Sequence, residues 1–260
     1  MKAGRGAGGA PPARVAFAPP EAWAGQVVTL SGAEHVHLAR ALRARCGDRI
    51  DSVDGAGGRA LLEVVEVGRS ATRCAVVSRG PAEPAARLAL RVAPCLTHGP
   101  RIDWLVEKAT ELGVAEFAPV VSARSVVRRD ARADAAHRAR WERLAVAAMK
   151  QSRRAWLPRI ALPLPLGAFL AARDPIERLI VPWEGASSGT SLGAHLRARP
   201  IGSEGRVALL VGPEGGLTEE EAREITAAGG ELVALGGAIL RSETAALAAV
   251  AIIRSAGGEI

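Results

Sequence analysis

The chain has 260 residues, of which 48% are hydrophobic and 23% charged. This composition is typical of globular proteins and excludes a disordered or fibrous chain. The length permits one large domain or two smaller ones, and the change of pattern described below favours two. Cys46, Cys74 and Cys95 lie far apart and form no CxxC pair. The sequence therefore predicts neither a disulfide framework nor a metal site, and it favours a reducing, cytoplasmic environment.

The first residues of the chain do not resemble a signal peptide. Residues 1–12 have no apolar core of the kind that a signal peptide carries, and we expect them to form a flexible tail. No stretch approaches the roughly 20 apolar residues that a membrane span requires. We expect a protein without a membrane partner.

The formal charge of +7 is concentrated in one segment, 122–159, where eleven arginine and lysine residues accompany only three acidic residues. A solvated helix face would explain a charge run, but such a face usually mixes signs. The excess of arginine favours a partner that carries phosphate groups.

Short β-type segments separated by turn residues fill the first third of the chain and predict a small β module. A helix is expected over 34–45, and a segment with two prolines at 80–87 predicts a linker. The expected strands are 14–17, 26–30, 49–53, 60–67 and 72–78.

After the linker, strands alternate with helices, which is typical of a mostly parallel sheet covered by helices. The expected strands are 88–96, 114–121, 178–183, 206–212 and 231–235. The expected helices are 102–112, ended by Gly113, then a helix around 141–149, 218–228 and 242–255.

The most informative segment follows the strand at 206–212. It reads GPEGG at 212–216, and Thr218 then precedes Glu221 by three residues, which predicts a capping box at a helix start. The sequence thus predicts a sharp turn from a strand into a helix.

Gly212, Gly215 and Gly216 let this turn adopt positive φ angles and let a ligand approach the backbone closely. A loop of this kind at the carboxyl edge of a sheet predicts a binding site. A plain glycine-rich turn fits the pattern equally well. The segment matches neither a Walker loop nor GxGxxG.

A second loop of similar design leaves the strand at 231–235 through Gly236 and Gly237, and Ser242 is expected to cap the last helix. Two adjacent strand ends then carry open backbone loops. Such a pair suits a ligand held by main-chain hydrogen bonds and apolar contacts.

These segments resemble one known family. WLVEKATELGVAEFAPVVSARSVV at 104–127, GPEGGLTEEE at 212–221 and LGGAILRSETAALAA at 235–249 occur in the family's order, and HLARALRARCGD at 37–48 and QSRR at 151–154 are similar to further motifs. The chain resembles the ribosomal RNA small-subunit methyltransferase E family of the SPOUT superfamily.

The resemblance implies an α/β fold with two domains. A PUA-like, RNA-binding β-barrel would cover 13–80, and a SPOUT methyltransferase domain with a parallel sheet and a trefoil knot would cover 88–260. It also implies a homodimer that uses S-adenosyl-L-methionine to methylate N3 of one uridine in 16S rRNA, on free rRNA or on the small ribosomal subunit. Arginines would stabilise the uracil anion that forms when N3 loses its proton.

Site residues carried over by motif fall into three groups. Expected catalytic residues are Arg124, Arg154, Arg241 and Glu243. Expected cofactor contacts are Leu210, Gly212, Pro213, Glu214, Gly215, Gly216, Leu235, Gly236, Ile239, Leu240 and Thr244. Expected RNA contacts are His37, Arg43, Arg128, Arg129 and Arg153.

The chain departs from the family pattern at four positions and leaves the proton acceptor open. It has Ala123, Ala147 and Lys150 where the family has glutamates, and Ala238 where the family has arginine. Two other functions are compatible with the sequence: a ribose 2′-O-methyltransferase of the same superfamily, and a ribosome-associated RNA-binding protein without turnover. The former usually ends in an SLNVS-like segment, whereas this chain has LRSETAA.

Overall fold

The computed structural model describes residues 15–97, 100–125, 130–186, 189–202 and 205–260. Its contacts divide the chain into two compact units: one comprises the chain up to Pro84 together with Arg153–Trp156, and the other comprises Ala85–Ser152 and Leu157–Ile260. The first unit consists of a β-sheet with short helical segments, and the second consists of strands and longer helices. No helix in the described ranges is long and apolar enough to cross a membrane.

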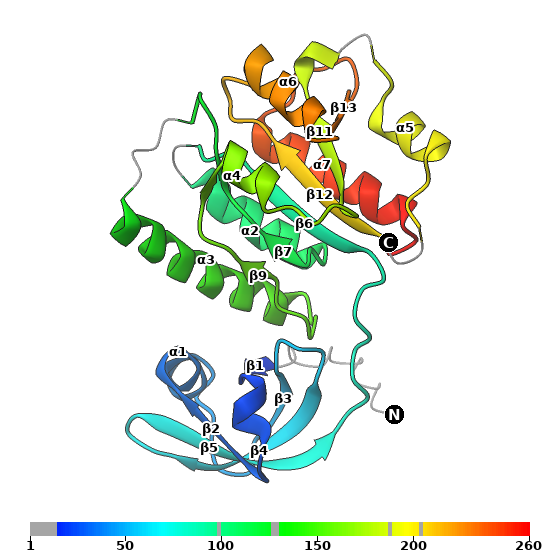
Figure 1. Ribbon diagram of the computed structural model, residues 1–260. Coiled ribbons are helices and arrows are strands. Elements are labelled where there is room, and N and C mark those ends of the chain that lie inside the picture. The colour runs from blue at the N-terminus through cyan, green and yellow to red at the C-terminus, as the bar shows by residue number, and fades with distance from the viewer. Residues whose placement is uncertain (1–14, 98–99, 126–129, 187–188, 203–204) are drawn as a thin grey trace, which may run out of the picture. The chain divides into compact units, whose positions relative to one another are not determined.

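The first unit is a curled five-stranded sheet with the order β1-β3-β4-β5-β2 (Figure 1). The β1–β3 pair is parallel and the other pairs are antiparallel. Leu38, Ile50 and Leu62 are fully or almost fully buried in its core. Its elements are β1 (Val15–Phe17), η1 (Pro20–Trp23), β2 (Val27–Ser31), α1 (Gly32–Val36), η2 (His37–Ala41), β3 (Arg49–Val53), β4 (Arg59–Val67) and β5 (Ala71–Arg79).

The helix expected over 34–45 is shorter in the structure. Helix α1 continues as the π-helical turn η2 and ends at Ala41, after which Arg43 has a φ of 49°. A non-glycine residue rarely adopts this left-handed conformation, so helical periodicity in the sequence did not reveal where the helix stops.

The second unit contains a six-stranded, entirely parallel sheet with the order β13-β11-β12-β6-β7-β9. The mostly parallel α/β organisation expected from the sequence is therefore confirmed. The strands of this sheet are β6 (Ala89–Pro94), β7 (Glu116–Phe117), β9 (Arg159–Ile160), β11 (Arg178–Pro182), β12 (Arg206–Val211) and β13 (Glu231–Val233).

Helices cover both faces of this sheet (Figure 1). Side chains that alternate along each strand enter two separate cores: Leu209 packs with α2, α3, α5 and α7, whereas Leu210 packs with α4 and α6. The helices are α2 (Arg101–Glu111), α3 (Ala131–Gln151), α4 (Leu166–Ala171), α5 (Leu192–Ala198), α6 (Glu219–Ala227) and α7 (Ser242–Ala256); α4 and α5 were not expected from the sequence.

The strand expected over 114–121 is interrupted. It forms β7 and, after Ala118-Pro119, β8 (Val120–Val121), which pairs with β10 (Leu164–Pro165) in a separate two-stranded sheet. Proline lacks the N–H that a ladder needs, which is consistent with a break at this point.

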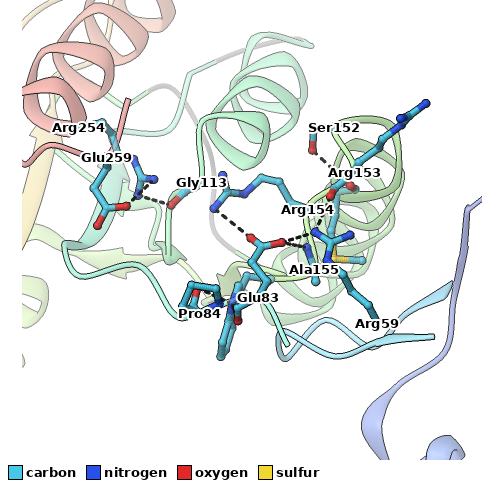
Figure 2. A network of polar contacts seen from close by, with 12 residues as sticks. Arg59, Glu83, Pro84, Gly113, Ser152, Arg153, Arg154, Ala155, Arg254 and Glu259 are labelled. Atoms are coloured by element: carbon cyan, nitrogen blue, oxygen red, sulfur yellow. Dashed lines mark hydrogen bonds and ion pairs between the residues drawn. The ribbon is translucent and has the colours of Figure 1, made fainter. Parts of the chain in front are cut away.

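A buried arginine joins three distant segments of the second unit (Figure 2). The guanidinium of Arg254 in α7 donates to the carbonyl of Gly113 at 2.9 Å and lies 3.4 Å from the Glu259 carboxylate. Glu259 also accepts the Leu88 N–H at 3.0 Å. Arg254 is only 1% exposed, so this charge depends on its protein partners.

Candidate functional site

The turn between β12 and α6 has the geometry expected from GPEGG and the capping box. The Thr218 hydroxyl accepts the Glu221 N–H at 3.1 Å, and the Glu221 carboxylate accepts the Thr218 N–H at 2.9 Å. Of the three glycines in the first loop, Gly216 has a positive φ, 70°. Position 216 therefore requires glycine more strictly than positions 212 and 215 do.

The second loop, 234–241, connects β13 to α7 beside the first. Gly236 has a φ of 130°, and a Cβ built on Gly236 or Gly237 would meet no atom within 4 Å. The expected cap by Ser242 is wrong: Arg241 occupies the N-cap position and no side chain caps the helix. The Ser242 hydroxyl is instead directed to Glu243, at 3.5 Å.

A third strand end completes a cleft between these loops. Pro182, the last residue of β11, and Trp183 and Glu184 directly after it line two adjoining hollows, one with the first loop and one with the second. The hollow at the first loop measures about 430 Å³. Its walls are mainly main chain and apolar side chains from 211–217 and 239–245. The cleft thus offers space, backbone donors and apolar surface at the carboxyl edge of the sheet.

Most of the predicted cofactor contacts lie in this cleft. The lining residues among them are Gly212, Pro213, Glu214, Gly215, Gly216, Leu235, Gly236, Ile239 and Leu240. Leu210 and Thr244 do not line it. Leu210 is fully buried in the core below the sheet edge, and the lining contains Val211 and Ala245 instead.

Two arginines hold the first loop from outside the strands that carry it. The Arg101 guanidinium, at the start of α2, forms an ion pair with Glu214, and its Nε lies 3.9 Å from the Glu243 carboxylate. Arg124 donates from its guanidinium to the Gly215 carbonyl. The structure therefore brings the predicted residues Arg124, Glu214 and Glu243 to one site.

A buried carboxylate positions Arg124. Glu221, which is 7% exposed, accepts the Ala123 N–H at 2.7 Å in addition to its capping bond. This bond ties the turn at 122–125 to the start of α6. Burial raises the pKa of the nearby Cys95 thiol to about 12, which disfavours its thiolate form.

Arg241 also lines the cleft, and its side chain is exposed. No hydrogen bond or ion pair of the Arg241 guanidinium is present among the described residues. A cationic group at the mouth of the cleft is therefore available to a bound molecule.

Arg153 and Arg154 belong to the first unit, not to the unit that contains the cleft. The Glu83 carboxylate accepts the Ala155 N–H at 2.8 Å, pairs with Arg59 and lies 3.8 Å from Arg154. Arg153 is exposed and has a φ of 57°, which is uncommon for a residue other than glycine. The contacts of Glu83 thus hold the segment Arg153–Trp156 in an uncommon backbone conformation. The catalytic role of Arg154 stays a prediction.

The remaining predicted RNA contacts are distributed over both units. In the first unit, His37 and Arg43 are exposed. In the second, α3 carries much of the basic segment on its exposed faces, while Trp141, Ala145 and Met149 face the core. Arg128 and Arg129 lie outside the described residues.

Sequence reasoning missed Arg101, Trp183 and Glu184. A basic residue in the first turn of a helix opposes the helix dipole, so Arg101 carried a signal that an anionic partner lies nearby. Trp183 and Glu184 follow a parallel strand, and such strand ends converge at one edge of the sheet. Trp183 and Glu184 lie beside the glycine loops because of the order of the strands in the sheet, and the sequence pattern does not predict that order.

Comparisons with known proteins agree on one family. A family model described as an RNA methyltransferase domain matches residues 84–254. Ribosomal RNA small subunit methyltransferase E of Bacillus subtilis (strain 168) is 31% identical over 86% of this chain and 88% of its own length.

Two solved structures resemble the chain over almost its whole length. A ribosomal RNA small subunit methyltransferase E from Neisseria gonorrhoeae, bound to S-adenosyl methionine, has a TM-score of 0.83 at 28% identity and covers 94% of this chain and 97% of its own. A methyltransferase from Legionella pneumophila, also with the bound cofactor, has a TM-score of 0.85 at 26% identity, with 94% and 98% covered.

Proposed function

Because the chain belongs to the ribosomal RNA small subunit methyltransferase E family, we propose that it methylates N3 of one uridine in 16S rRNA. The chain is an rRNA methyltransferase, and its cofactor is S-adenosylmethionine. The proposal rests mainly on one observation: the segments that follow β11, β12 and β13 line one cleft, and Arg241 lies at its entrance.

The cleft fits this cofactor. Trp183, Leu235 and Leu240 would supply apolar surface for the adenine, and the open space at Gly236 and Gly237 would admit a ligand against the backbone. When bound, S-adenosylmethionine supplies an electrophilic methyl group on a sulfonium. The chain's own part is to hold the donor and to orient the base.

Uridine N3 carries a proton, so attack on a methyl group requires its removal and leaves negative charge on the uracil oxygens. In our proposal the free guanidinium of Arg241 stabilises that charge. Arg124, held against the Gly215 carbonyl, adds a second positive charge beside the cleft. We assign Glu214 and Glu243 to orientation, because Arg101 already pairs with them.

Electrostatic attraction to rRNA phosphates is proposed to involve α3. Arg132 and Arg143 are exposed on this helix and make no side-chain ion pair within the described ranges, unlike Arg138, which pairs with Glu142. We expect the double change Arg132→Glu and Arg143→Glu to weaken rRNA-fragment binding by about tenfold or more at moderate salt and to flatten the salt dependence.

Titrations of a 16S rRNA fragment at several salt concentrations measure this effect, with cofactor affinity as an internal check. Arg223→Glu on α6 is a single charge reversal outside α3, to be compared with the single changes Arg132→Glu and Arg143→Glu. If the double variant keeps the salt slope of the native protein, α3 is only a solvated face.

Analysis of rRNA nucleosides by mass spectrometry tests the proposed base. Small-subunit rRNA from a strain that lacks the gene should lose 3-methyluridine at one position and regain it when the gene is supplied. A lost 2′-O-methylnucleoside would instead identify a ribose methyltransferase. An unchanged nucleoside profile would contradict both enzymatic assignments.

A further inference from the structure

Of the described carboxylates that line the cleft, one, that of Glu184, has no cationic partner within the described ranges. Glu184 lines both hollows, and its carboxylate lies so close to Gly216 that a Cβ there would be 2.0 Å from its Oε1. Among the described residues Glu184 makes no hydrogen bond or ion pair. The second glutamate of the lining, Glu214, is neutralised by Arg101.

The charged side chains of the cleft thus fall into two groups: those that bind the first loop and those without a partner in the described part of the chain. Arg101 and Arg124 are engaged with the first loop, through Glu214 and the Gly215 carbonyl. Glu184 and Arg241 are free to interact with bound molecules, and no ion pair joins them. One free negative charge thus lies against the glycine loop, and one free positive charge lies at the start of α7.

This arrangement matters because the charge of the cofactor changes in the reaction. The donor sulfur is a sulfonium cation. After transfer, the electrons of the broken carbon–sulfur bond remain on sulfur, and the product, S-adenosylhomocysteine, has a neutral thioether. Its adenosine and amino acid groups are the same in both molecules, so only a charge near sulfur distinguishes them electrostatically.

We infer that Glu184 is a specificity-determining residue that favours the sulfonium form of the cofactor over the neutral product. It attracts the cation when the methyl donor binds and loses that attraction after transfer, which promotes product release. The inference concerns the cofactor site alone and does not depend on which base is methylated.

Calorimetric titration of the full chain with S-adenosylmethionine and with S-adenosylhomocysteine tests this role without RNA. We expect Glu184→Gln to weaken binding of the donor by about tenfold and to leave binding of the product nearly unchanged, since the amide has the same shape but no charge. An analogue with a protonated amine in place of the sulfonium should behave like the donor. The loss should shrink at high salt.

Two variants control the comparison. Glu184→Asp keeps the charge and should keep most of the preference for the donor. Glu220→Gln makes the same chemical change on α6, where Glu220 pairs with Arg223 outside the cleft, and should alter neither affinity. Circular dichroism and thermal melting establish that each variant is folded.

Equal weakening of donor and product by Glu184→Gln would overturn the inference, because the carboxylate would then bind a group common to both, such as the ribose hydroxyls. Unchanged affinity for both would also overturn it. Failure of the native protein to methylate uridine, with the affinity ratio still dependent on Glu184, would contradict only the proposed base.

Discussion

Replacing Gly216 with valine is expected to reduce S-adenosylmethionine affinity by about a hundredfold or more. Gly216 has a φ of 70°, a conformation that a β-branched residue resists. A Cβ at this position would also lie 2.0 Å from the Glu184 carboxylate oxygen. The loop would have to change its path, or Glu184 would have to leave the cleft, and either change disrupts the cofactor site.

Gly229→Val separates backbone strain from damage to the site. Gly229 has a φ of 80°, close to that of Gly216, but a Cβ there meets no atom within 4 Å and the residue lies in the turn after α6. Calorimetric titration with S-adenosylmethionine should show lost binding for Gly216→Val and native binding for Gly229→Val. Native affinity in both variants would remove Gly216 from the cofactor site.

The largest effect on stability is expected for Arg254→Met. This change removes the guanidinium that contacts Gly113 and Glu259, and it leaves the partly buried Glu259 carboxylate without its cation. Removing one partner of a buried ion pair costs about 3–5 kcal/mol. Methionine fills most of the same volume, so the loss reflects the polar contacts and not a cavity.

Urea denaturation followed by circular dichroism and tryptophan fluorescence measures the change in free energy of unfolding. Glu259→Gln is the comparison variant: it removes the negative charge but keeps the side-chain shape and one acceptor oxygen, for either Arg254 or the Leu88 N–H, so it should cost less than Arg254→Met. A cost below about 1 kcal/mol for Arg254→Met would mean that water or another group replaces the guanidinium.

Local pattern predicted the elements that carry the site. The strand at 206–212 and the capping box at Thr218 appear in the structure almost as expected, because strand propensity and cap chemistry act within a few residues. The helix over 34–45 and the strand over 114–121 were wrong in extent. The strand ends early because β8 pairs with β10, far along the chain, and the helix ends before Arg43, whose positive φ helical periodicity does not reveal.

The sequence by itself determined that two glycine-bearing loops each follow a strand and precede a helix, because glycine, proline and capping residues dictate local backbone geometry. Contrary to expectation, the two strands are not adjacent, since β11 lies between β12 and β13 in the sheet. Only the tertiary structure decided which side chains surround the loops. Arg101 and Glu184 come from the start of α2 and the end of β11, and they meet the GPEGG loop because the parallel strand order places these ends at one edge of the sheet. The structure was needed to show that Arg101 pairs with Glu214, whereas Glu184 has no partner among the described residues.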